Sequence, residues 1–191
     1  MTLSARRVLS RARVSLEFFE WAGRRSFRDA WMECPRGDWL LRLAAALRID
    51  RPVLVRATIA CVHPSLARAR PGRGPWGRAM KVALAWCDGR ATIVEAHRAA
   101  HEASTAVGVA QTLTSAAWAT DAAWSSTATV DHASWAEVAV SQAAESAASA
   151  APPGSKDEAR AAFLLGAAET VRRIIPYDLA AGPARALKLY P

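Results

Sequence analysis

The sequence predicts an all-α fold: a compact, single-domain bundle of about seven to nine helices that is rich in alanine. The chain has 191 residues, of which 52% are hydrophobic, so it can bury a core without disulfides or structural metals. Apolar residues recur at helical spacing, and no run alternates between apolar and polar residues as a half-buried strand does. Capping residues, glycines and prolines divide the chain into segments of helical length. These observations favour helices over strands.

The first segment, Leu3–Ala22, is expected to form one amphipathic helix. Its apolar side chains repeat on one side with arginines on the other, and Gly23 provides a stop. Ser26 has the form of an N-cap for a short helix that runs through Met32.

A turn and a further helix are predicted next. Pro35 and Gly37 interrupt the helical pattern. Asp38 is expected to be the N-cap of the following helix, with its carboxylate accepting hydrogen bonds from the amides freed at the helix start. The apolar stripe of this helix, which should face the core, consists of Trp39, Leu40, Leu43 and Leu47.

The middle of the chain is expected to hold two helices around its clearest loop. One helix should run from Val53 to about Ala69, with a kink or break at Pro64. Pro71–Gly77 (PGRGPWG) has the composition of a loop and is basic on both sides. The second helix is expected over Trp76–Asp88.

The Ala-rich tract Ala91–Ala151 is expected to form two helices, with a boundary near Ser125–Asp131. Thr92–Glu95 has the pattern of a capping box that opens the first of them. Ser155–Glu158 repeats that pattern and opens a third helix, which Pro176 should end.

Charge is distributed unevenly along the chain. The formal net charge is +8, and 22 of the 25 basic side chains are arginine. Residues 1–80 contain 16 arginines and six acidic residues, whereas residues 91–151 contain one arginine and six acidic residues. A basic pole and an acidic pole favour an acidic partner at the basic end, which could be a protein, a nucleic acid or a membrane surface. Alternatively, the arginines form a solvated face whose stems cover apolar surface.

The three cysteines, Cys34, Cys61 and Cys87, are widely spaced among apolar neighbours. Their spacing argues against a disulfide framework or a thiolate zinc site, so we expect buried thiols and a cytoplasmic protein. No apolar run is long enough to span a membrane, and the N-terminus lacks the apolar segment of a secretory signal.

The sequence contains no strong catalytic motif, and we expect no enzymatic activity and no cofactor. His97 and His101 are four residues apart beside Glu102, which would suit two metal ligands on one helical face. The pattern does not continue as a zinc-protease motif, so we expect no metal, and a helical metalloenzyme is a third hypothesis. Cys61 and His63 are two residues apart and should point to different faces of a helix, away from a nucleophile–base arrangement.

Three segments carry a resemblance to a known family. They are Trp31–Leu43 (WMECPRGDWLLRL), Ala79–Thr92 (AMKVALAWCDGRAT) and Glu169–Pro176 (ETVRRIIP). In this order and spacing they resemble the Imm5-like family of bacterial immunity proteins over residues 27–176. The positions that carry the distinctive part of the match, interpreted as a structural motif, are Trp31, Cys34, Gly37, Asp38 and Trp39.

The resemblance implies a cytosolic helical protein that neutralises a cognate toxin by binding it, without enzymatic activity. It divides the chain into an Arg-rich N-terminal helix (1–25), the Imm5-like helical domain (26–176) and a C-terminal tail (177–191) with one or two helical turns. The chain departs from the family pattern at Arg42, where an apolar or aromatic residue is expected, and in the loop after Cys61.

The basic pole contains our candidate for the partner-binding surface. An immunity protein needs a surface that is complementary to its toxin, often in charge. Arginine and tryptophan frequently dominate the energy of protein interfaces. The residues expected to contact the partner, which should be acidic there, are Arg68, Arg70, Arg73, Trp76 and Arg78.

Two alternatives to an immunity protein stay open. The chain could be an adaptor or regulatory helical protein that binds a different protein. It could also be a basic nucleic-acid-associated protein, in which case binding would weaken steeply with salt.

Overall fold

The computed structural model describes residues 3–12, 14–66, 75–107, 125, 128–129 and 132–186. All regular elements within these ranges are α-helices, apart from one isolated antiparallel bridge between Ser4 and Ser26. The prediction of a compact, all-α fold is therefore confirmed. The helices are α1 (Ala5–Ala12), α2 (Leu16–Ala22), α3 (Phe27–Glu33), α4 (Gly37–Ala46), α5 (Arg51–Leu66), α6 (Pro75–Cys87), α7 (Ile93–Val107), α9 (Trp135–Ala150), α10 (Lys156–Ile174) and α11 (Tyr177–Ala186).

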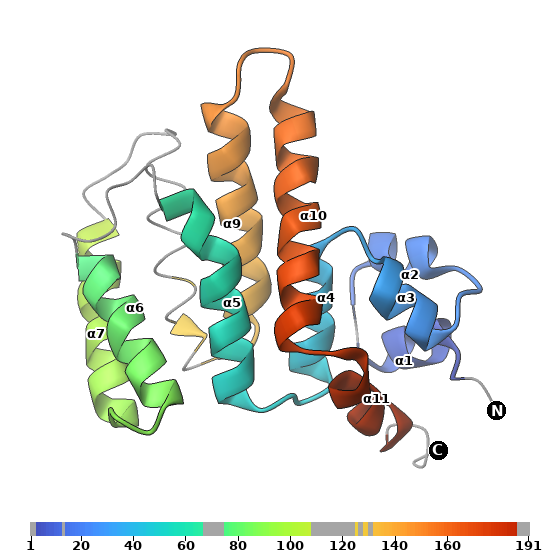
Figure 1. Ribbon diagram of the computed structural model, residues 1–191, viewed down its shortest axis with the longest axis horizontal. Helices are drawn as coiled ribbons and strands as arrows, with labels where there is room; N and C mark the ends of the chain where they lie inside the picture. Colours follow the sequence, from blue (N-terminus) through green and yellow to red (C-terminus); the bar gives the residue numbers. More distant parts are fainter. Residues whose placement is uncertain are drawn as a thin grey trace.

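Four helices form the centre of the molecule (Figure 1). The long antiparallel pair α9 and α10 packs against α4 on one side and α5 on the other. The hairpin of α6 and α7 joins this centre through α5, and α1–α3 with α11 lie at the opposite end (Figure 1). Among the described helices, none combines the length and apolarity needed to cross a lipid bilayer.

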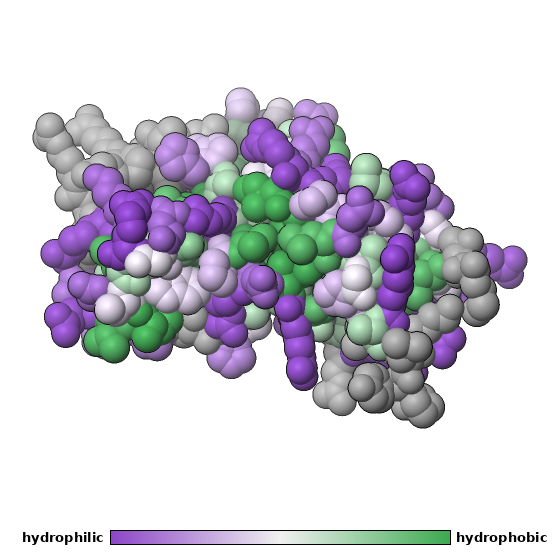
Figure 2. Space-filling model, turned by 60° about the horizontal axis from the view of Figure 1, so that its bottom comes forward, coloured by the Kyte–Doolittle hydropathy of each residue, from purple (hydrophilic) through white to green (hydrophobic). Residues whose placement is uncertain are grey.

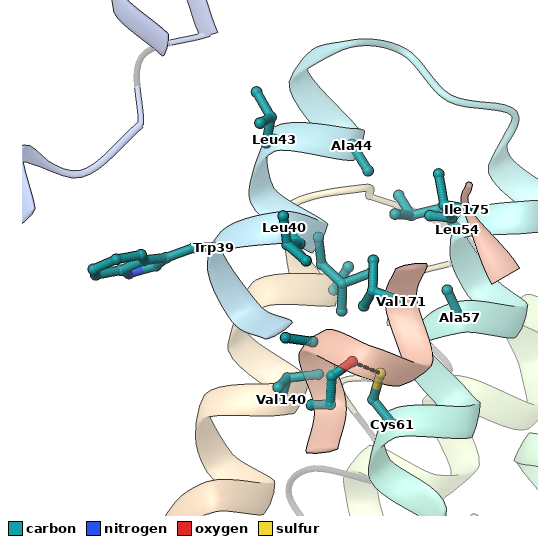
Figure 3. Packing of buried hydrophobic residues seen from close by; sticks show 14 of the residues in the cluster. Trp39, Leu40, Leu43, Ala44, Leu54, Ala57, Cys61, Val140, Val171 and Ile175 are labelled. Atoms are coloured by element: carbon teal, nitrogen blue, oxygen red, sulfur yellow. Dashed lines mark hydrogen bonds between the residues drawn. The ribbon is translucent and has the colours of Figure 1, made fainter. Parts of the chain in front are cut away.

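The core lies where α4, α5, α9 and α10 meet (Figure 3). Leucine, isoleucine and valine side chains fill the space between helices, while alanines let the helix backbones approach closely. Among the completely or almost completely buried members of this core are Leu40, Leu43, Leu54, Val140, Val171 and Ile175.

The expectation of a single helix over Leu3–Ala22 is wrong. The chain forms α1 and α2 with a break between them, because the Ser15 hydroxyl accepts a hydrogen bond from the Phe18 amide at 3.3 Å and caps a new helix. The break allows Leu9 of α1 and Phe18 of α2 both to be fully buried. The Arg-rich N-terminal segment therefore packs on the rest of the protein, and α1 contacts α2, α3 and α4.

One predicted N-cap residue is wrong and one predicted capping box does not form, although the helices that follow them are present. Arg36, not Asp38, is the N-cap of α4, and Asp38 lies inside the first turn, where it is buried in an ion pair. Ser155 precedes α10 but makes no side-chain capping hydrogen bond. The Ser26 cap of α3 is confirmed, because its hydroxyl accepts from the Asp29 amide at 3.1 Å.

Two other segments differ from their expected form. Pro64 does not break α5, since it lies in the last turn of one continuous helix. The C-terminal tail contains more helix than one or two turns: α11 has ten residues and packs against α3. Burial of Ala180, Ala181 and Ala184 supplies the packing that holds this helix.

Candidate functional site

The turn between α6 and α7 is fixed by its own backbone. Gly89 has φ +69°, a left-handed conformation that glycine adopts without strain. The Arg90 amide donates to the Ala85 carbonyl at 2.8 Å, and the Gly89 amide donates to the Trp86 carbonyl at 2.9 Å. These bonds satisfy carbonyls at the end of α6, as in a Schellman motif, and turn the chain back antiparallel.

A capping box then starts α7, as the sequence predicts. The Thr92 amide donates to Glu95 Oε2 at 2.7 Å, and the Glu95 amide donates to Thr92 Oγ1 at 3.2 Å. Because the ionised carboxylate accepts from both the amide and the hydroxyl of Thr92, the pKa of Glu95 is lowered, with a further contribution from Arg98. The first turn of α7 is thus fixed beside the end of α6.

A groove of about 360 Å³ runs along this hairpin. Its apolar floor comes from small side chains, because Val82, Ala85, Ala91 and Ala99 line it. Beneath them, Ala79, Ala99 and Ala103 form the buried contact between α6 and α7. Charged side chains stand at the rim. The residues that line the groove are Arg78, Lys81, Val82, Ala85, Ala91, Glu95, Arg98, Ala99 and Glu102.

The groove carries more positive than negative charge. Arg78 of α6 forms an ion pair with Glu102 of α7, which neutralises both side chains across the groove. Lys81 and Arg98 are exposed, and neither forms an ion pair within the described part of the chain. Two cations beside an apolar floor can accept a carboxylate carried on an apolar stem, such as an acidic side chain of a protein partner.

Exposed apolar side chains lie at one end of the groove. Ile93 is 40% exposed and Val94 is 61% exposed, both in the first turn of α7. Val94 precedes the groove residue Arg98 by four positions, so the two side chains share a helical face. Figure 2 shows hydrophobic atoms beside hydrophilic ones at the lower edge of the α6–α7 end of the molecule.

The predicted partner-binding residues have different outcomes. Arg78 lines the groove. Trp76 belongs to the first turn of α6, and its side chain lies outside the described part of the structure. Arg68, Arg70 and Arg73 also lie outside the described residues.

Sequence reasoning missed Lys81 and Arg98, although a signal for them was present. The α6 residues in the groove are 78, 81, 82 and 85, and the α7 residues are 95, 98, 99 and 102. Both sets follow the same i, i+3, i+4, i+7 spacing, which marks one face of a helix. When two neighbouring helices both repeat this spacing and both place charged and small apolar residues on that face, the pattern indicates a shared groove with charged side chains along its edges.

The motif residues identified from the sequence lie in the core, at the α3–α4 junction. Trp31, Cys34, Gly37, Asp38 and Trp39 are all buried. Trp39 stacks on the ring of Phe18, with 5.0 Å between ring centroids. A Cβ atom on Gly37 would lie 2.6 Å from the Cβ of Ala167, so only glycine fits where α4 meets α10.

Asp38 is the polar centre of this junction. Its side chain is 2% exposed and accepts hydrogen bonds from Arg36 Nε at 3.1 Å and Arg36 Nη2 at 2.6 Å. The hydroxyl of Ser141 and the amide of Trp39 donate to the same carboxylate. The bond to Asp38 raises the pKa of Arg36, whose guanidinium also lies 4.4 Å from the centre of the Trp39 ring. The charge of Asp38 is therefore fully engaged within the protein.

Two of the three cysteines, Cys34 and Cys61, are buried. Burial raises the pKa of Cys34 and of Cys61 to about 12, so both remain thiols at neutral pH. Cys61 Sγ donates to the carbonyl of Ala167 at 3.5 Å (Figure 3), whereas His63 is exposed. The prediction that all three cysteines are buried is wrong for Cys87, which is partly exposed at the end of α6.

His97 and His101 are exposed on α7. Within the described ranges, no group of three His, Cys, Asp or Glu side chains is arranged to hold a metal ion.

Comparison with known proteins gives no assignment. No protein-family profile, curated protein or solved structure matches this chain. The resemblance to Imm5-like immunity proteins therefore stays a prediction from the motif residues.

Proposed function

We propose that this chain is a non-enzymatic protein-binding module of the immunity type, which neutralises a cognate bacterial toxin in the cytoplasm by direct binding. The observation that carries the binding part of this proposal is the α6–α7 groove, in which Lys81 and Arg98 flank an apolar floor without ion-pair partners in the described chain. The resemblance of residues 27–176 to Imm5-like proteins supports the immunity part.

The groove suits a protein partner by its size and chemistry. A volume of about 360 Å³ is large enough for one or two side chains. The cations at the rim favour an acidic residue, and the exposed Ile93 and Val94 provide apolar contact next to it. We therefore propose that an acidic segment of the partner binds along α6 and α7, with Arg78 held in place by Glu102.

Charge reversal in the groove tests this proposal. The tagged protein is purified from its native cell at two salt concentrations, with nuclease treatment, and bound proteins are identified by mass spectrometry. We expect one stoichiometric protein partner from the wild type, and at least a tenfold loss of it from a variant carrying Lys81→Glu and Arg98→Glu, because two attractive contacts become repulsive. The matched control carries Arg7→Glu and Arg24→Glu, two charge reversals at exposed positions of the N-terminal helical region at the opposite end of the molecule.

Three results would contradict parts of the proposal. Equal recovery of the partner by the groove variant and by the control would exclude the groove as its binding site. Recovery of nucleic acid, with proteins lost after nuclease treatment, would favour the nucleic-acid-associated alternative. A partner that is not a toxin, and whose activity the chain does not inhibit, would favour the adaptor alternative.

The partner-binding residues that the sequence predicts before Arg78 are tested with a separate variant. Changing Arg70, Arg73 and Trp76 together to Ala should weaken the same partner if the basic segment before α6 extends the binding surface. Unchanged affinity would remove these residues, with Arg68 beside them, from the proposal.

A further inference from the structure

Helix α10 has one face in the core and one face in solvent. Leu164, Ala167, Ala168 and Val171 are buried against α4, α5 and α9. On the opposite side, exposed residues follow one another along the helix, and at about 100° per residue they fall within an arc of about 100°. The residues of this outer face are Glu158, Ala162, Leu165, Gly166, Glu169 and Arg173.

The middle of the outer face consists of an apolar side chain followed by a glycine, which has no side chain. Leu165 is 47% exposed and supplies the large apolar side chain of this face. Gly166 follows it, and a Cβ atom at this position would meet no atom within 4 Å. Glycine destabilises a helix interior relative to alanine, and an alanine would fit here, so the fold of the single chain gives no reason for glycine at this position. A glycine on an exposed helix face is explained if the backbone of another helix packs closely against it.

The charges of this face are arranged symmetrically about its centre. Glu158 lies seven residues before Leu165, and Arg173 lies seven residues after Gly166. Both side chains are exposed, and neither forms a hydrogen bond or ion pair within the described residues. At 1.5 Å per residue the two positions are about 22 Å apart along the helix. The face therefore carries one unpaired charge of each sign at its two ends.

We propose that the outer face of α10 binds the same face of a second copy of this chain, with the two α10 helices antiparallel about a twofold axis. In this register, Glu158 of each copy lies opposite Arg173 of the other, and Leu165 of each packs over Gly166 of the other. A parallel arrangement would instead place like charges together at both ends. The self-complementary charge pattern is what selects a second copy over an unrelated partner.

The remaining polar residue of the face is compatible with this register. Glu169 lies opposite the small side chain of Ala162 and one turn from Arg173 on its own helix, so both carboxylates can share that guanidinium. The contact is limited to one helix of 19 residues from each copy, about 28 Å in length. It lies at the small end of specific interfaces, and we expect a dissociation constant on the order of 100 µM.

Sedimentation analysis of the purified chain from low to millimolar concentration tests the proposal, without any toxin or other partner. The wild type should form a dimer in the upper part of that range. Glu158→Arg or Arg173→Glu alone should weaken the dimer about tenfold, since symmetry converts two attractive pairs into two repulsive ones. The double variant, with the charges exchanged, should recover wild-type affinity.

The controls separate dimerisation from folding. Circular dichroism should be close to wild type for every variant, and thermal unfolding should show only the small loss expected when a charge is reversed at an exposed end of a helix. Arg7→Glu changes the net charge as Arg173→Glu does, and it should leave the dimer unchanged. A chain that stays monomeric throughout, a dimer insensitive to both single variants, or a double variant that fails to recover would each overturn the proposal.

Discussion

Small residues join helices in two regions of this molecule, with opposite results. Where α4 meets α10, Gly37 brings the backbones so close that a methyl group in its place would collide with Ala167. Between α6 and α7, the alanine contacts leave a groove of about 360 Å³ with charged side chains around it. The first region is closed and holds the fold together, whereas the second is open to a partner.

The two regions also differ in whether their charged side chains are paired within the protein. In the closed region, Asp38 accepts bonds from Arg36, Ser141 and Trp39, so its charge is used inside the protein. In the open groove, Lys81 and Arg98 have no ion pair within the described residues. The most distinctive motif of the sequence is thus structural, and the candidate binding surface is made of ordinary residues.

Thiol reactivity should show the largest difference between the two regions. Cys34 and Cys61 lie in the closed region with pKa values raised to about 12 from an ordinary value of 9.0, so their thiolate populations at pH 8 should be about a thousandfold below normal. Cys87 is partly exposed at the end of α6, so it should be alkylated first. Mass spectrometry of the native protein at successive times measures the three rates separately.

The control is alkylation in denaturant, where all three cysteines should react at similar rates. Native labelling of Cys34 as fast as that of Cys87 would mean that the junction of α3, α4 and α10 opens readily, which would break the comparison.

Gly37→Ala should have the next largest effect. The added Cβ would lie 2.6 to 2.8 Å from the Cβ and carbonyl carbon of Ala167 and the amide nitrogen of Ala168, so α4 and α10 must separate. We expect the free energy of unfolding to fall by about 3 kcal/mol, measured by chemical denaturation. Gly166→Ala, in the interior of α10, is the matched control at micromolar protein concentration, because no atom lies within 4 Å of its added Cβ. It should be neutral or slightly stabilising, and an equal loss for both variants would refute close packing at Gly37.

The helical framework could be predicted from the sequence because its signals are local. Thr92 and Glu95 are three residues apart, and their capping box forms as predicted. Ser26 caps α3 for the same reason. In each case the residues that make the hydrogen bonds are near neighbours in the chain, so the fold elsewhere does not compete with them.

Several predictions that failed involve contacts between residues that are distant in the chain. Asp38 has a side chain suited to a helix cap, but Arg36 and Ser141 of α9 offer its carboxylate stronger bonds in the core. The break between α1 and α2 has a local cause, the Ser15 cap, and a distant one, the burial of Phe18 against Trp39 of α4. The groove forms only when α6 and α7 lie side by side, which neither helix specifies alone. The sequence therefore predicts only Arg78 among the described charges of the groove.

The smallest effect should come from the capping box that positions the open groove. Hydrogen bonds from Thr92 lower the pKa of Glu95 in the folded protein below its ordinary value of 4.5. A carboxylate with a lowered pKa stabilises the fold at pH values above its unfolded pKa, and this stabilisation is lost as the pH falls through the folded pKa. The first turn of α7 should therefore loosen as the pH falls below 4.5. The amide proton of Thr92 reports this by NMR, because its chemical shift should titrate with a midpoint below 4.5.

The control is Glu95→Gln, which should abolish that titration. A midpoint at or above 4.5 in the wild type would show that the capping box does not hold the groove in solution.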